Sequence, residues 1–452
     1  MHDSAELALR AAQLGGTHAT GAPLHTIIGH WLTYVASTPA AATTWLSVVC
    51  AALTAGLVVL LISEWVARPW LAAAGGLVFA LLPPIWINAV ITELYAPSLL
   101  LVSGALLALR RWEAGDGGGL PLTAMVLLGL ALGAHFANAL LLPVLLLLVL
   151  AVSRKLSTAL LCGLLMLGAI ALVAAANVWL ALRLPPLSEH LPLSAGGLWL
   201  YMTGAEHQAR VASGGAFYMS RVAEHLAIVA GNFVFVGLPF IALGWWRMWR
   251  ATRRFATALT GTVVIWFGYF TLFGSGDYFV MIGPVYLLCA VWLALGVADI
   301  AERWSGAIPL SLQGVAPAAA LAVFAAAALL LQWQERRNFA QSAAVQTYVD
   351  DALAAWPDNA VVIARWNEFT ALRYAQVVDQ ARGDVSLLLP ARTARHYEHG
   401  IVSDYFDYVS AVMCERPVVT NKLTAEIEAG FAVTDVPGTR SWLQLQPPAR
   451  CQ

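Results

Sequence analysis

Charge is scarce in this sequence, and its scarcity excludes a soluble fold for most of the chain. Only 11% of the 452 residues are Asp, Glu, Lys or Arg, whereas 60% are hydrophobic. The mean hydropathy is +0.72. Soluble proteins of this length rarely have so few charged residues, so a polytopic protein of the lipid bilayer is predicted. The net charge of -1 indicates no nucleic-acid binding.

Cysteine is also scarce, and its spacing argues against a thiol metal site. The sequence has five cysteines and no CxxC motif. Cys50, Cys162 and Cys289 lie in apolar segments, where packing is the simplest role. Cys414 and Cys451 both fall in the polar tail, where a disulfide is possible.

Targeting and metal motifs are absent as well. Met1 is followed directly by His2 and Asp3, so the sequence lacks the basic and apolar regions of a cleavable signal peptide. It also has no HExxH motif, no carboxylate triad and no evident internal repeat. No cofactor is therefore predicted, although the residue types present leave a divalent metal open.

The charges that are present divide the chain into two parts. Residues 1–334 contain 26 charged side chains, and residues 335–452 contain 25. Segments of about 17–25 apolar residues can cross a membrane. About ten apolar segments lie at 44–62, 70–90, 94–112, 121–135, 137–152, 156–182, 226–246, 255–274, 278–298 and 314–334. The sequence predicts a mainly α, polytopic transmembrane helical bundle over 44–334, followed by a small soluble α/β domain over 335–452.

The stretch 121–152 is too long for one crossing. Gly133, His135, Asn138 and Pro143 interrupt it. We therefore expect two short helices that meet near the outer surface.

Basic residues concentrate in alternate loops. Ten Arg and Lys residues fall in one set of loops, and four fall in the intervening set: Arg10, Arg183, Arg210 and Arg221. This asymmetry is typical of the positive-inside rule. It places four regions on the non-cytoplasmic face: residues 1–43 with interfacial helices, the large loop 183–224, the turn around Asp277, and the tail 335–452.

The tail has the pattern of one small α/β domain. Short β-rich runs at 361–363, 385–389, 418–419 and 443–445 alternate with helical stretches such as 367–382 and 404–413. Trp366, Asn367 and Glu368 follow the first run. Asn367 is expected to cap the next helix. Trp366 is a candidate for a substrate-facing role, because ligands of α/β domains gather beyond the carboxyl ends of the strands.

Asp3 and Glu6 open the first external loop. Three residues apart, they share a face of a helix. The simpler interpretation is a capping box, in which each side chain binds a free backbone N–H. The functional interpretation is a carboxylate at the membrane surface that takes a proton from an acceptor hydroxyl. The two roles are compatible.

Further polar residues are assigned to the same external face. Glu93 is costly so near the apolar layer unless it is paired or in a wet cavity, which makes it a default site candidate. Arg210 could hold a phosphate through its guanidinium fork, and His18 could pair with one. Each of these polar residues by itself has an ordinary structural explanation. Their common assignment to one face is the stronger indication of a binding site. The candidate substrate-binding residues are His18, Glu93, Tyr95, His135, Asn138, Arg210, Asp277 and Trp366.

Several of these clusters together resemble the protein O-mannosyltransferase-like group of multipass proteins, which have the GT-C architecture. The matching segments include Asp3 to Leu7, His18 to Leu24, Thr92 to Ala96, Leu130 to His135, Asp277 to Phe279, and Ala360 to Trp366 leading into Leu372-Arg373-Tyr374. Two departures are Ala5, where the family usually has Gly, and Ala134, where it usually has Asn. The transmembrane helix expected before the first loop is also missing.

The resemblance implies an inverting glycosyltransferase of the cell membrane. Its donor would be a polyprenyl-phosphate sugar, and its acceptor the hydroxyl of a protein Ser or Thr, or of a glycan. The resemblance places the essential acid at Asp3, with Glu6 beside it. Two other classes stay open: a lipid or solute transporter or flippase, and a non-catalytic membrane assembly protein. A transporter would need ionisable residues in mid-span and internal repeats, and the sequence shows neither.

Overall fold

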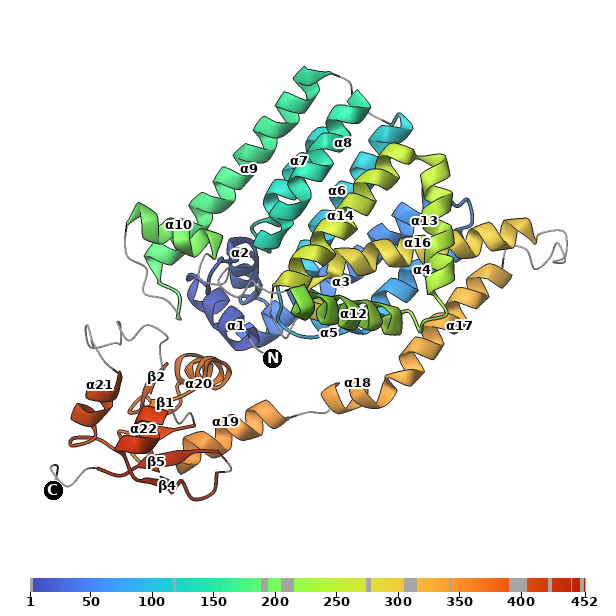
Figure 1. Cartoon of the computed structure of the whole chain (residues 1–452). Coiled ribbons are helices and arrows are strands. Elements are labelled where there is room, and N and C mark those ends of the chain that lie inside the picture. Colours follow the sequence, from blue (N-terminus) through green and yellow to red (C-terminus); the bar gives the residue numbers. More distant parts are fainter. Residues whose placement is uncertain are drawn as a thin grey trace.

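Apolar segments of the chain form a layered body of helices, and the polar tail forms a separate small sheet domain beside one end of it (Figure 1). The coordinates are a computed structural model. They describe residues 3–116, 119–153, 155–187, 194–204, 215–273, 278–304, 315–340, 343–389, 405–421, 425–439, 441–447 and 451.

Five helices of the described residues are long and apolar enough to cross a membrane. They are α3 (Pro39–Ser63), η1 with α8 (Phe136–Leu141, Leu142–Ser153), α9 (Leu156–Arg183), α14 (Arg253–Leu272) and α16 (Gly283–Arg303). A sixth span results if α4 (Pro69–Leu81) and α5 (Pro83–Ala89) are taken together, although they are bent by 71°. The chain is therefore a multipass membrane protein, with fewer full-length spans among these residues than the ten apolar segments suggested.

The other segments of the body form shorter or more polar helices. The bend between α4 and α5 falls at Pro83 and Pro84, because proline cannot donate the hydrogen bond that continues a helix. The remaining helices are α6 (Tyr95–Ala114), α7 (Leu120–Ala131), α10 (Ala195–Thr203), α12 (Gly215–Asn232), α13 (Leu238–Ala251), α15 (Tyr278–Met281), α17 (Ala316–Leu331) and α18 (Trp333–Ala340).

The structure agrees with one predicted detail of the helices and contradicts another. The stretch 121–152 forms two short helices separated at His135, as expected. The segment 226–246 was expected to be one span, and this was wrong. It is divided between α12 and α13 by a turn in which Val234 and Phe235 both adopt a φ of 53°. Apolar content alone does not distinguish such a turn from a continuous helix.

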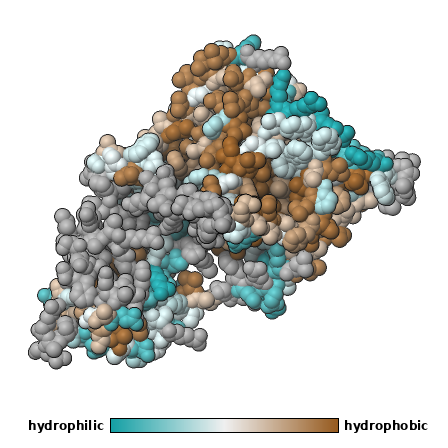
Figure 2. All heavy atoms as spheres, in the orientation of Figure 1, coloured by the Kyte–Doolittle hydropathy of each residue, from teal (hydrophilic) through white to brown (hydrophobic). Residues whose placement is uncertain are grey.

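The centre of the body is α16, which is almost entirely buried, with Tyr286, Leu288 and Val291 fully enclosed. Hydrophobic residues cover much of the surface of the body, and hydrophilic ones gather along one edge and over the small domain (Figure 2). Apolar side chains such as Trp70 and Leu164 are exposed, as expected where lipid replaces water.

Residues 3–32 form two short helices outside the long spans, α1 (Ser4–Gln13) and α2 (Pro23–Leu32). Short helices are therefore present where the sequence predicted one or two interfacial helices. The first packs against α2, α3 and, from the small domain, α20 (Trp366–Val378).

The tail forms a five-stranded sheet in the order β2-β1-β3-β5-β4. Strands β1 (Val361–Ile363), β2 (Ser386–Leu388) and β3 (Val418–Thr420) are parallel, whereas β5 (Leu443–Leu445) pairs antiparallel with β3 and with β4 (Val433–Asp435). The sequence missed β4, whose three residues are all exposed.

Helices cover both faces of this sheet. One apolar core joins α19 (Ala344–Ala355) and α20 to the sheet, and a second core joins α21 (Tyr405–Val412) and α22 (Ala425–Gly430). Cys414 and Cys451 form a disulfide that ties the end of the chain to this domain. The helix after β1 begins at Trp366 with Arg365 as its N-cap residue, so the expected cap at Asn367 was wrong by two positions.

Candidate functional site

The site is built around Asp3, Glu6 and His18, which the fold of α1 and its following loop brings together. One oxygen of Glu6 accepts the backbone N–H of His18 at 2.8 Å, and the other lies 2.5 Å from His18 Nδ1. The other ring nitrogen, Nε2, lies 3.7 Å from Asp3 Oδ2. Glu6 is fully buried, whereas the side chains of His18 and Asp3 are 23% and 32% exposed. The buried carboxylate therefore holds the imidazole, and the imidazole faces the accessible carboxylate.

The capping box expected at this position does not form. Asp3 occupies the N-cap of α1, but within the described chain its side chain caps no backbone N–H. Glu6 accepts hydrogen from the His18 backbone and ring instead. Neither acid therefore caps the N-terminus of α1, and both are available to the site.

The loop that carries His18 is fixed by two later helices. Asn177 of α9 donates to the carbonyl of Thr20 at 2.9 Å, and Tyr201 of α10 donates to the carbonyl of Thr17 at 2.8 Å. Gly21, which follows Thr20, has a φ of +78°, and a Cβ there would lie 2.0 Å from the Asn177 amide oxygen. Glycine is needed at this position for both reasons.

The small domain reaches the site through Trp366. Its indole Nε1 donates to Asp3 Oδ1 at 2.8 Å, and its ring meets the His18 ring edge-to-face, with centroids 6.1 Å apart. Trp366 is the first residue of α20, which lies beside α1 in Figure 1. The sequence placed Trp366 among the site candidates, and the structure brings it to Asp3 across 363 residues.

Glu93 lies in the turn between α5 and α6, and hydroxyl groups hold this turn in place. Ser47 Oγ lies 3.3 Å from both the backbone N and O of Glu93. Next to it, the Thr92 hydroxyl lies 2.7 Å from that of Thr43, and the Thr92 carbonyl accepts from Ser4 at 2.8 Å. The turn is therefore attached to α3 and to the start of α1.

Burial raises the pKa of Glu93 to about 8, and the negative charge of Asp3 adds to the effect. At neutral pH Glu93 is thus mostly protonated, so it can donate a hydrogen bond while Asp3 accepts one. Two carboxyl groups in such different environments are suited to different roles in acid–base chemistry.

His135 lies in the break between α7 and η1. Its ring is close to that of Tyr95, the first residue of α6, with ring centroids 5.2 Å apart. Burial is the main cause that lowers the pKa of His135 to about 4, so it is neutral at physiological pH. Asn138 is fully buried, and its amide donates to the carbonyls of Ala131 and His135 at 2.8 and 2.9 Å. Its hydrogen bonds stabilise the break itself.

Arg10 is buried on α1 and bound by the chain itself. Its guanidinium donates to Gln13 Oε1 at 3.0 Å and to the carbonyl of Pro185. Burial lowers its pKa to about 10, which leaves it positively charged at neutral pH. It joins α1 to the segment after α9. His18 is the basic group beside Asp3.

Some predicted site residues cannot be placed, and other residues of the site were missed. Arg210 and Asp277 lie outside the described residues. Thr43, Ser47 and Asn177 were not predicted, although polar side chains inside otherwise apolar helices are a usable signal. The sequence gives no comparable signal for Tyr201.

Asp3, Glu6 and His18 also offer ligand atoms that lie within 4.8 Å of one another. This donor set could hold a divalent metal, because carboxylate and imidazole are both common ligands. Both oxygens of Glu6 are already bound to His18, so a metal would have to replace that contact.

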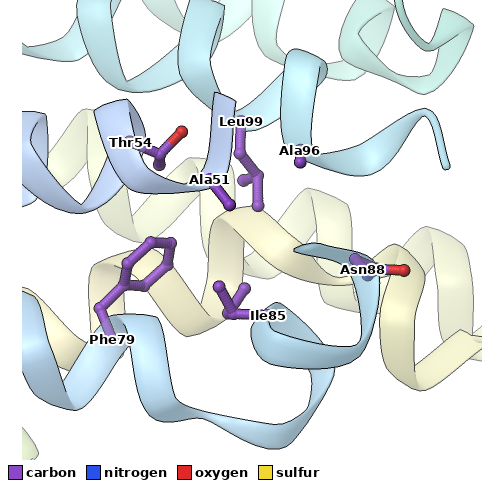
Figure 3. Close-up of a pocket in the computed structure, with 7 residues that line it drawn as sticks. All are labelled: Ala51, Thr54, Phe79, Ile85, Asn88, Ala96 and Leu99. Atoms are coloured by element: carbon purple, nitrogen blue, oxygen red, sulfur yellow. The ribbon is translucent and has the colours of Figure 1, made fainter. Parts of the chain in front are cut away.

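A cavity below the turn at Glu93 is too small for a substrate. It has a volume of about 10 Å³ and is lined by residues of α3 to α6, with Asn88 and Thr54 among apolar neighbours (Figure 3). This volume is close to the space that one water molecule needs. The candidate site residues Asp3, Glu6, His18 and Trp366 do not line it and lie at the junction of α1, its loop and α20.

Comparison with known proteins gives one family match and two structures of similar fold. Residues 3–159 match the family described as Protein O-mannosyl-transferase TMEM260 N-terminal domain. No curated protein matches the chain. Two crystal structures of ArnT from Cupriavidus metallidurans are similar in fold, each over 100% of this chain and 93% of that chain with 14% identity. The apo state has a TM-score of 0.66, and the state bound to undecaprenyl phosphate has a TM-score of 0.63.

These matches confirm two predictions. The fold is a GT-C-like helical body with a small α/β domain, and the resemblance to the O-mannosyltransferase-like group holds over the first third of the chain. That third contains Asp3, Glu6, His18 and Glu93.

Proposed function

We propose that this chain is an integral-membrane glycosyltransferase that transfers a sugar from a polyprenyl-phosphate donor to an acceptor hydroxyl. The observation that carries the proposal is the accessible Asp3 carboxylate beside the Glu6–His18 pair, on a fold shared with ArnT. The matched family favours a mannosyl donor and the hydroxyl of a protein Ser or Thr as the acceptor.

The proposed reaction uses Asp3 as the base. Asp3 Oδ2 takes the proton from the acceptor hydroxyl, and the acceptor oxygen forms a bond to the anomeric carbon. The bond from that carbon to the phosphate oxygen breaks, and its electron pair leaves with the polyprenyl phosphate. Attack opposite the leaving group inverts the anomeric configuration.

Neighbouring residues assist this step in different ways. Glu6 keeps Nδ1 of His18 occupied, so the imidazole presents Nε2 to Asp3 and the developing negative charge. Arg210, from the loop 183–224, is a second candidate to bind the leaving phosphate. Protonated Glu93 and the rings of Tyr95 and His135 are candidates to contact the sugar.

We further propose that this reaction takes place on the non-cytoplasmic side of the cell membrane. The Cys414–Cys451 disulfide supports an oxidising compartment for the small domain. The site lies near the first residues of α3, whereas Glu64 after its other end pairs with Arg111, a residue of the basic loops. A helix of 25 residues is about 37 Å long, so these groups lie at opposite ends of the body.

The test is a transfer assay with the purified full-length chain in proteoliposomes. The donor is radiolabelled undecaprenyl-phosphate mannose, and the acceptors are Ser- and Thr-containing peptides. Asp3→Asn keeps the size of the side chain and loses the base, so transfer should fall by about 10²- to 10⁴-fold. Equal expression and melting temperature of the two proteins are the control. Unchanged transfer by Asp3→Asn would refute the role of Asp3.

A further inference from the structure

The contact between Trp366 and Asp3 lies at a position where α/β domains usually bind ligands. Parallel strands β1 and β3 are neighbours, yet β1 continues through α20 to β2 on its other side. The chain therefore leaves β1 at a point where the strand order reverses, and ligand crevices form at the carboxyl ends of strands there. In this protein α20 presents Trp366 from that edge to Asp3 of the membrane body.

A second contact on α20 holds the small domain independently of Asp3. Tyr374 is two turns after Trp366, and its hydroxyl oxygen accepts the backbone N–H of Ala40 at 3.3 Å. Docking through Tyr374 does not involve a carboxylate. Trp366 differs, because its only polar atom, the indole Nε1, is bound to a carboxylate that is 32% exposed.

We propose that Trp366 is a positioning residue for Asp3, so that the small domain supplies one part of the active site. The indole N–H holds Oδ1, and this turns Oδ2 toward His18 and the acceptor. This inference rests on the proposed function and specifies how the base is oriented. It also assigns the domain a task in the reaction beyond attachment to the membrane body.

The carboxylate of Asp3 needs a neighbour to fix its orientation. Asp3 precedes the first turn of α1 and is bound by no cap interaction of its own within the described chain. A partly exposed carboxylate rotates readily about its side-chain bonds unless a neighbour fixes it. The indole N–H of Trp366 supplies such a contact at Oδ1. The same indole ring meets the His18 ring edge-to-face, so one side chain orients both groups.

The test compares Trp366→Phe with Tyr374→Phe in the same proteoliposome assay. Trp366→Phe keeps an aromatic ring and removes the N–H. Misplaced catalytic groups cost up to about 10²-fold, so kcat should fall by roughly 10- to 100-fold while KM for the acceptor peptide changes little. Tyr374→Phe should leave kcat within about threefold of the parent.

A second replacement keeps the test decisive if Trp366→Phe loosens the domain. Benzothienylalanine at position 366 retains the bicyclic ring and lacks only the N–H, so it should show the same loss of kcat at an unchanged melting temperature. A parental kcat in this variant would overturn the inference, as would an equal loss in Tyr374→Phe. The proposed function fails separately, if the parent transfers no sugar or if Asp3→Asn transfers normally.

Discussion

Three acidic side chains at the proposed site, Glu6, Asp3 and Glu93, lie in different environments, and for this reason we assign them separate tasks. Glu6 has no exposed surface and both of its oxygens contact His18, so it acts on the imidazole and not on a substrate. Asp3 is partly exposed and can meet an acceptor. Glu93 is kept protonated by burial. The assignment of a base at Asp3 depends on these differences, since side chains of the same type are otherwise interchangeable.

The raised pKa of Glu93 predicts an alkaline limit to activity. Above about pH 8 Glu93 ionises, and a second negative charge then opposes a charged Asp3 and a departing phosphate. Transfer should therefore fall with a midpoint near pH 8. Glu93→Gln, which is neutral at every pH, should lose this limb. Glu428→Gln, an exposed position on α22, is the control and should keep it.

The same group makes stability depend on pH, with a defined sign. The folded state keeps the Glu93 proton up to about pH 8, whereas the unfolded state loses it near the ordinary value of 4.5. The contribution to stability is complete below about pH 4.5 and is lost as the pH rises to about 8. The melting temperature of Glu93→Gln relative to the parent should therefore be higher at pH 9 than at pH 5. An identical difference at both values would contradict the shift.

At the scale of elements, the body depends on one unusually close helix contact. A Cβ on Gly244 of α13 would lie 1.7 Å from the carbonyl oxygen of Trp292, and one on Gly296 of α16 would lie 1.9 Å from that of Phe240. Both distances are far below van der Waals contact. Small residues permit such backbone approach in membranes, where helices associate by packing and not by the hydrophobic effect.

Gly244→Ala and Gly296→Ala should each destabilise the protein by about 1–3 kcal/mol, because a methyl group forces α13 and α16 apart. The measurement is thermal unfolding in detergent. Gly163→Ala and Gly168→Ala on α9 are matched controls, since a Cβ at either position meets no atom within 4 Å. Alanine favours helix over glycine, so these controls should be neutral or slightly stabilising. Equal effects at all four positions would show that the close contact is unimportant.

At the scale of the whole molecule, the positions of charges and of the site predict a direction for the chain across the membrane. Arg247 binds Glu302 through two nitrogens, at 2.6 and 2.9 Å, and Arg303 binds Asp299 at 2.6 Å. These pairs belong to the basic loops predicted to be cytoplasmic. The carboxylates of the active site and the disulfide belong to the other set of segments.

A membrane-impermeant maleimide can check this direction in intact cells. Asp358→Cys, at a fully exposed position of the small domain, should be labelled from outside. Arg254→Cys, exposed near the start of α14, should be labelled only after permeabilisation. The parent provides a low background, because three of its cysteines are buried and the other two are bonded. The reverse pattern would place the small domain in the cytoplasm and refute the proposed side.

Much of the fold could be read from hydrophobicity, because a span, a break or a strand is a local pattern. The helix break at His135, the α/β tail and the run Val361–Ile363 were predicted for this reason. Predictions failed where the deciding interaction is not local. The turn at Val234 interrupts an apolar run, and β4 has no buried face to produce alternation.

The sequence by itself determined that this protein is a membrane body with a soluble tail, and its loop charges predicted that the candidate site residues share one face. Composition and segment length suffice for the first conclusion, since transfer into lipid depends on both. Only the tertiary structure decided which of these groups touch. The 2.8 Å contact of Trp366 with Asp3 and the attachment of the His18 loop by Asn177 join residues far apart in the chain. Hydrogen bonds act over about 3 Å, and no spacing along a sequence specifies such a distance.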